Sequence, residues 1–205
     1  MFRALAPFAA EEDGPGLRDL ERALGEDEAF RRRFLGSSVR NALVRDTLAI
    51  TVLRAGERTN VMPAVAVAEI DGRILPGGSC ALFEQRVRDA VDDPRVEIEA
   101  LLSFGNRISG TETPLFRAID AVSKRADPPG VVIPRVSVGF TDAHYFRDLG
   151  VDAYGFVPRR LAPEETRGIH GVNERIAIGN LVFGVEQLTE ILLTLDQLER
   201  GERSE

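Results

Sequence analysis

The sequence predicts a mixed α/β and α+β protein with two domains, residues 1–104 and residues 105–205. Apolar residues recur at helical spacing in some segments and form short β-branched runs in others, which indicates both helices and strands. Hydrophobic residues make up 43% of the chain and charged residues 29%, which is typical of a soluble globular protein with a packed core. A polar, glycine-containing stretch over residues 105–113 is typical of a crossing between domains.

The predicted first domain follows the order helix, strand, strand, helix, strand. A loop that contains residues 11–16 precedes a helical pattern beginning near Leu17. Ser79 is a good N-cap for a helix over about residues 80–91. The expected strands are short and rich in β-branched or alternating apolar residues: 47–53, 64–70 and 96–102. This order matches most of a split βαβ, or ferredoxin-like, sandwich whose first strand is missing.

The predicted second domain alternates helices with apolar strands. Helices are expected over residues 114–125, 142–149 and 178–198, and strands over residues 131–138 and 151–157. Continuous apolar strands between helices favour the C-terminal part of a doubly wound α/β sheet.

Charge and composition exclude several classes of partner. The net charge of -7 argues against nucleic acid, because phosphate contacts need a clustered basic surface. No apolar run approaches the roughly 18 residues that span a bilayer, so no membrane partner is expected. The single cysteine, Cys80, excludes an intrachain disulfide framework and agrees with a cytoplasmic location. We interpret Cys80 as a small buried hydrophobe and not as a nucleophile.

One of the two histidines is the first candidate for chemistry. His170 lies in a polar loop between an apolar strand and the long C-terminal helix. Ligands of open α/β sheets collect beyond the strand ends, and a neutral imidazole there is a ready zinc ligand. A purely structural histidine is the alternative. Glu174 either orients the His170 imidazole without itself binding zinc, or is a carboxylate favoured at a helix N-terminus.

A second polar segment, residues 137–143, also follows a predicted strand. Gly139 permits a tight turn with exposed backbone N–H groups, and Thr141 or Asp142 can cap the next helix. A turn with a cap is one interpretation of this segment. Contact with a substrate carboxylate or an oxyanion is the sharper one.

Several segments together resemble, in chain order, the motifs of M20-type zinc peptidases and amidohydrolases. Residues 59–63 and 71–77 resemble the N-x-x-P and D-x-R motifs of the family's lid, or dimerisation, domain. Residues 139–147 resemble its G-G-T-D-A motif, with Phe140 in place of the second glycine. Further along, residues 154–158 and then 170–174 continue the order, the last resembling the terminal H-G-x-x-E.

The resemblance implies a reaction that uses two zinc ions, which clamp the scissile carbonyl and activate water, with a glutamate as general base. It implies that His170 binds one zinc ion, with Asp142 and Glu174 behind the ligands. The implied substrate-binding residues are Asn60, Arg73, Gly139 and Thr141. The natural substrate would be a small peptide or an acylated amino acid.

The family's other zinc ligands lie in an H-x-D motif, a bridging aspartate and an E-E pair, which this sequence does not show in matching context. We therefore expect a fragment of a peptide- or amide-bond hydrolase that is inactive alone, because a catalytic zinc needs about three protein ligands. The resemblance also implies a homodimer through the lid domain. A non-catalytic dimerisation or binding module and an unrelated α/β protein are the alternatives.

Overall fold

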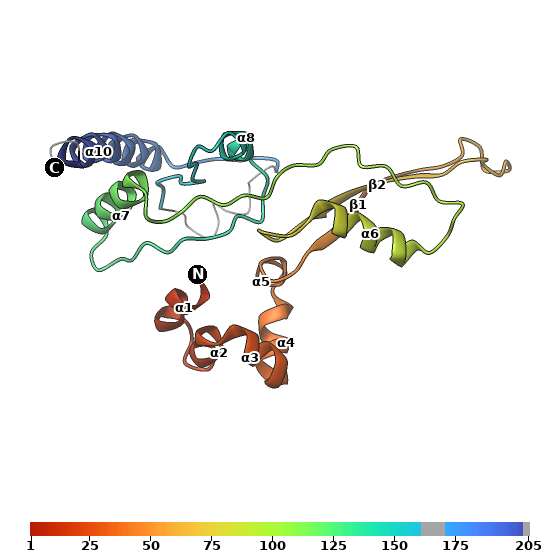
Figure 1. Cartoon of the computed structure of the whole chain (residues 1–205), viewed down its shortest axis with the longest axis horizontal. Helices are drawn as coiled ribbons and strands as arrows, with labels where there is room; N and C mark the ends of the chain where they lie inside the picture. Colours follow the sequence, from red (N-terminus) through yellow and green to blue (C-terminus); the bar gives the residue numbers. More distant parts are fainter. Residues whose placement is uncertain (161–170, 203–205) are drawn as a thin grey trace. The chain divides into compact units, whose positions relative to one another are not determined.

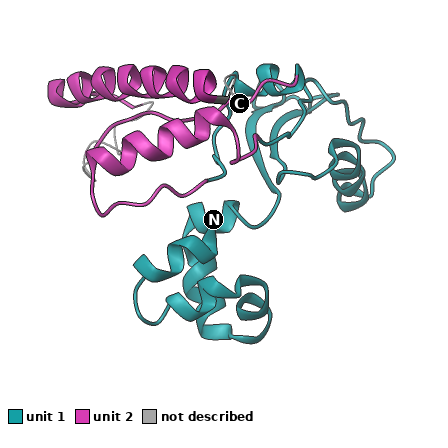
Figure 2. Ribbon diagram, turned by 60° about the vertical axis from the view of Figure 1, so that its left-hand side comes forward, with its two compact units in different colours: residues 1–108, 135–149 teal, residues 109–134, 150–205 magenta. Residues whose placement is uncertain are grey.

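A computed structural model describes residues 1–160 and 171–202 (Figure 1). The chain divides into two compact units that each contain two segments (Figure 2). Unit 1 comprises residues 1–108 and 135–149, and unit 2 comprises residues 109–134 and 150–205. The turn around Gly139 therefore belongs to the same unit as the strand that carries Arg73. The expected domain boundary between residues 104 and 105 stays a prediction.

The N-terminal part of unit 1 is a cluster of short helices, where we expected a loop and then one helix. The helices are α1 (Phe2–Leu5), η1 (Ala6–Phe8), α2 (Gly14–Arg18), α3 (Leu20–Glu26), α4 (Glu28–Gly36) and α5 (Ser38–Ala42). Capping side chains mark the start of the last two helices. Asp27 caps α4 by accepting from the Phe30 amide at 2.9 Å, and Ser37 caps α5 by accepting from the Arg40 amide at 3.4 Å. A proline in the first turn of α2 allows helix inside the expected loop, because that position needs no N–H.

Two aromatic rings form the core of this cluster. Phe30 and Phe34 are fully buried and stack with their centroids 5.5 Å apart. Phe2 from α1 meets the Phe34 ring edge-on at 5.4 Å. Gly16 lies against the Phe30 ring so closely that a Cβ there would overlap it. The core therefore requires a residue without a side chain in α2.

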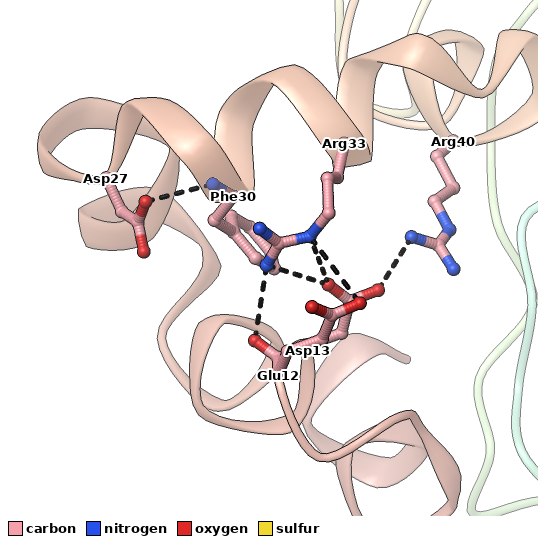
Figure 3. A network of polar contacts seen from close by, with 6 residues as sticks. All are labelled: Glu12, Asp13, Asp27, Phe30, Arg33 and Arg40. Atoms are coloured by element: carbon pink, nitrogen blue, oxygen red, sulfur yellow. Dashed lines mark hydrogen bonds and ion pairs between the residues drawn. The ribbon is translucent and has the colours of Figure 1, made fainter.

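An acidic side chain in this cluster is buried between two arginines (Figure 3). Asp13 lies before α2, and its Oδ1 accepts from Arg33 of α4 at 3.3 Å. Its Oδ2 accepts from Arg40 of α5 at 3.1 Å. The network joins helices that are distant in sequence, which fixes α4 and α5 against the start of α2.

The second part of unit 1 is a β-hairpin with one helix. β1 (Thr47–Arg54) pairs antiparallel with β2 (Val67–Arg73), and Thr47 lies opposite Arg73. We expected the second strand to begin at Ala64, but it begins at Val67, because β1 ends opposite that residue. α6 (Cys80–Val91) follows, and Ser79 caps it as predicted by accepting from the Leu82 amide at 3.3 Å.

Three expected strands do not form. In the described residues the only strands are β1 and β2, and residues 96–102, 131–138 and 151–157 lie outside helices and strands. A strand needs a partner at ladder spacing, which an apolar run does not specify. The mixed helix-and-sheet class is confirmed. Neither the ferredoxin-like sandwich nor the doubly wound sheet is established by this structure.

Unit 2 is built on two helices that lie side by side in both views (Figures 1 and 2). They are α7 (Pro114–Ala126) and α10 (Ile178–Glu202), close to the helices predicted over these segments. Their common core contains Ala118, Ile119 and Val122 of α7 with Ile191 of α10. Tyr154 and Phe156 also pack against this core.

The segment Ile178–Gly201 within α10 is long and apolar enough to cross a membrane, by length and composition only. This corrects the expectation that no segment reaches that length. Length and composition alone do not separate a membrane span from a core helix of a soluble protein. Ile191 is buried against α7, whereas most of the apolar side chains of this segment are exposed in the structure.

Candidate functional site

The C-terminal end of β2 contacts the turn that follows residue 136 in unit 1. Arg73, the last residue of β2, donates from Nη1 to the backbone carbonyl of Val138 at 3.1 Å. Its Nε and Nη2 lie 2.9 and 2.8 Å from Oδ2 of Asp71. The structure thus brings together two segments 65 residues apart, both of which the sequence marked as substrate-binding.

Residues 137–142, which we name the Gly139 turn, contain a short-range hydrogen bond. The Gly139 amide donates to Oγ of Ser137 at 3.1 Å. α8 (Ala143–Asp148) follows, close to the helix predicted over residues 142–149. Asp142 takes the N-cap position of α8 but its side chain makes no capping bond, contrary to one of our interpretations. Thr141 and Asp142 are both exposed.

A buried histidine lies directly behind this turn. His144 in α8 is 4% exposed, and its Nδ1 lies 3.0 Å from the backbone carbonyl of Thr141. Its ring contacts the rings of Phe104, Phe140 and Tyr145, with centroid distances of 4.3, 4.7 and 3.8 Å. Sequence reasoning gave His144 no role. Phe140 lies before α8, so helical spacing in the sequence did not indicate that the two rings meet.

The Arg73 guanidinium has donors left for an anion. A guanidinium has five N–H donors, and Asp71 and Val138 take only part of that capacity. The Arg73 side chain is 45% exposed, so the remaining donors reach solvent. Arginine pairs with carboxylates through two parallel hydrogen bonds, which gives geometric selectivity as well as attraction.

The other predicted site residues lie apart from this contact or outside the described structure. Asn60 is exposed in the connection between β1 and β2. Glu174 is exposed just before α10, next to Asn173, whose φ is 67°. His170 falls within residues 161–170 and so lies outside the described residues.

The described residues do not fit a zinc ion. Among residues 1–160 and 171–202, no group of three or more His, Cys, Asp or Glu side chains is placed to hold a metal. A zinc site needs about three or four such ligands at fixed distances. No chemical step of this chain can therefore be built through zinc from these residues.

A resolved pKa shift occurs away from the Gly139 turn. Beyond α6, the Arg95 guanidinium donates to Asp93 and holds the pKa of that carboxyl below its ordinary value. The same bond raises the pKa of Arg95. The Arg95 side chain is 87% exposed and that of Asp93 29%, so this pair is a local contact at the surface.

Comparison with known proteins gives several relatives. The N-fatty-acyl-amino acid synthase/hydrolase PM20D1 of Mus musculus is 30% identical over 166 residues, which cover 77% of this chain and 32% of that protein. The protein of the same name from Xenopus tropicalis is 37% identical over 143 residues, covering 67% of this chain and 27% of that protein. "Probable carboxypeptidase S-like 2" of Dictyostelium discoideum is 30% identical over 142 residues, covering 68% of this chain and 27% of that protein.

No family model matches the sequence, and no solved structure matches the chain at a significant level. The chain spans about a third of the length of the curated relatives it matches. The relatives nevertheless match two thirds or more of this chain, from four kinds of animal and from an amoeba. These likenesses agree with the motifs read in order along the sequence, and the chain belongs to the M20 family of peptidases and amidohydrolases.

Proposed function

We propose that this chain is the substrate-binding side of a zinc-dependent M20 hydrolase that cleaves peptide or amide bonds. The observation that carries the proposal is the 3.1 Å hydrogen bond from Arg73 to the carbonyl of Val138. It joins the D-x-R strand to the Gly139 turn, so the two segments act on one ligand. The ligand group that suits this pair is a carboxylate.

The names of the relatives support the same ligand chemistry. Two of them are named for N-fatty-acyl-amino acids and one for carboxypeptidase activity. Both kinds of substrate carry a free carboxylate close to the amide bond that is cleaved. We propose that Arg73 binds this carboxylate, with Asn60, Gly139 and Thr141 around the reacting part of the substrate.

His170 is our proposed zinc ligand, with Asp142 and Glu174 placed behind the metal centre. When bound, two zinc ions would polarise the scissile carbonyl and activate a water molecule. The described residues offer no further ligand set, so we propose that this chain alone neither holds a working metal centre nor hydrolyses substrate. Calorimetric titration with zinc and an acyl-amino-acid assay test this. Tight stoichiometric binding together with turnover would refute it.

The carboxylate contact can be tested on the full chain without metal. An NMR titration would compare an N-acetyl amino acid with its uncharged C-terminal amide. We expect the acid to shift the signals of Arg73 and the Gly139 amide, and the amide to shift neither. Arg73→Ala should abolish the effect.

Arg54 provides the matched control for that titration. It lies at the end of β1, is ion-paired with Glu69, and belongs to no family motif. Arg54→Ala should leave the titration unchanged. Equal losses in Arg54→Ala and Arg73→Ala, or equal shifts with the acid and its amide, would show that Arg73 is only one surface charge among others.

A second candidate function is dimerisation through the hairpin. β1 and β2 expose large apolar side chains, among them Ile50 at 62% and Leu53 at 73%. Exposed apolar patches of this kind mark interaction surfaces. We propose that β1, β2 and α6 are part of a ferredoxin-like lid that forms a homodimer in a cytoplasmic enzyme. Sedimentation at several concentrations tests this, because a monomer at all concentrations contradicts a dimer.

A further inference from the structure

We infer that His144 is a positioning residue that fixes the Gly139 turn, and through the turn the carbonyl that orients Arg73. The inference rests on the function proposed above, because it assigns His144 to the carboxylate-binding pair. His144 lies within residues 139–147 but follows the T-D-A residues of the motif, and the resemblance assigns it no role. Its role follows from its hydrogen bond, its burial and the rings around it.

The hydrogen bond fixes the tautomer of the His144 ring. Nδ1 lies 3.0 Å from the carbonyl oxygen of Thr141, and a carbonyl oxygen only accepts. Nδ1 therefore carries the hydrogen, and in the neutral ring Nε2 is a bare acceptor. In the part of the chain that the structure describes, the buried Nε2 has no hydrogen-bond partner. The side chain is thus held through one polar atom, and that atom is bonded to the turn.

The surrounding rings lock the imidazole in this orientation. Phe104 meets it edge-on with a centroid distance of 4.3 Å, and Phe140 approaches to 4.7 Å. Phe140 and Phe104 also contact each other, with centroids 5.0 Å apart. Phe140 is itself in the Gly139 turn, so the turn is attached to His144 twice, by a ring contact and by the Thr141 carbonyl. Rotation of the imidazole would break both attachments.

The consequence for Arg73 follows from the short length of the turn. Arg73 donates to the carbonyl of Val138, and His144 donates to the carbonyl of Thr141, three residues later. A change in the backbone between them would move both carbonyls. The Gly139 amide lies between the two and would move with them. His144 thus helps to define where a carboxylate meets Arg73, without touching it.

Two substitutions separate the two ring nitrogens. The side-chain amide of asparagine places its NH₂ near the position of Nδ1, whereas the longer glutamine places its NH₂ near Nε2. His144→Asn therefore can restore the bond to Thr141, and His144→Gln cannot. Phe146→Leu is the control for any change in α8. Phe146 lies two residues after His144 in the same helix and is 55% exposed.

The test is NMR on the isotopically labelled full chain, without ligand or metal. The sequence has two histidines, so their ring signals can be assigned by substitution. In the unsubstituted chain we expect a hydrogen on Nδ1 of His144. The amide signals of residues 138–141 and the Nε–H signal of Arg73 should stay near their positions in His144→Asn and Phe146→Leu. They should shift in His144→Gln.

Absence of a hydrogen on Nδ1 of His144 in the unsubstituted chain overturns the inference, whatever the variants do. Equal shifts in His144→Asn and His144→Gln also overturn it, because the ring would then only fill space. Neither measurement involves a carboxylate or zinc. The positioning role can therefore fail while the carboxylate titration succeeds, and a failed titration leaves the tautomer and the turn signals to be judged separately.

Discussion

Replacement of Asp13 by alanine should lower the free energy of unfolding by about 1 to 2 kcal/mol. The Asp13 side chain is 11% exposed, whereas its partners Arg33 and Arg40 are 38% and 42% exposed. Hydrogen bonds to charged groups contribute about 1.5 to 3 kcal/mol when buried, and exposed ion pairs about 0.2 to 1 kcal/mol. Because both arginines are partly exposed, we expect each ion pair to contribute close to about 1 kcal/mol, the upper value for exposed pairs.

The substitution leaves the local helix start unchanged, which simplifies its interpretation. Asp13 occupies the N-cap position of α2 but makes no capping bond with its side chain. The two arginines can be rehydrated after the substitution, so no fully buried charge is left unpaired. The lost stability therefore reports the network in Figure 3 and not a cap.

Urea denaturation of the full chain, followed by circular dichroism, measures the effect. Glu12→Ala is the matched control, because Glu12 approaches Arg33 only to 4.0 Å and is 67% exposed. We expect that control to stay within about 0.5 kcal/mol of the unsubstituted chain. If Asp13→Ala and Glu12→Ala change stability equally, the two arginines do not form the specific network described.

Three further outcomes follow from local contacts. Thr113→Ala should destabilise unit 2 by about 1 kcal/mol or more in thermal unfolding. Thr113 caps α7 by accepting from a backbone amide at 3.0 Å, and its hydroxyl also lies 2.6 Å from the Tyr154 hydroxyl. An unchanged midpoint would exclude a contribution from these bonds. Gly72→Ala should destabilise the hairpin, because its Cβ would overlap the Phe83 ring of α6, and amide exchange in β2 should then accelerate. The Asp93 carboxyl should titrate below its ordinary pKa by NMR, and R95Q should remove the shift. Because that pKa is depressed on folding, the pair stabilises above the unfolded pKa and loses its effect as pH falls through the folded one.

Local signals in the sequence predicted the helices whose capping and helix-breaking residues lie at their ends. Ser79 and the break at residues 92–94 predicted α6, and both its cap and its end are observed. The long apolar periodicity after residue 177 predicted α10 in the same way. These features depend on neighbours in sequence, which a single chain displays.

The strand predictions were wrong where the pairing of strands decides whether a strand forms. The runs over residues 131–138 and 151–157 are apolar enough for buried strands, yet they form no ladder in the described structure. β2 begins three residues later than expected because its partner ends there. Strand pairing is set by distant segments, which composition and spacing do not reveal.

The candidate site was predictable in part. Family motifs indicated Arg73 and the Gly139 turn, and the structure brings them into contact. The motif-like stretch of residues 139–147 contains His144 but does not indicate that its ring lies behind the turn, because its ring partner Phe104 is 40 residues away in sequence. Its burial and its bond to Thr141 appear only in three dimensions.

The most direct test of the proposed role is a chimera in which this chain replaces the matching segment of the mouse relative. Its zinc content and its hydrolysis of an N-fatty-acyl-amino acid would be measured. We predict an active chimera in which Arg73→Ala raises KM about tenfold or more, the loss of roughly 1.4 kcal/mol of carboxylate binding, while Arg54→Ala does not. His170→Ala should lower both the bound zinc and kcat. An active chimera whose zinc content and kinetics are unchanged by Arg73→Ala and His170→Ala would contradict the account.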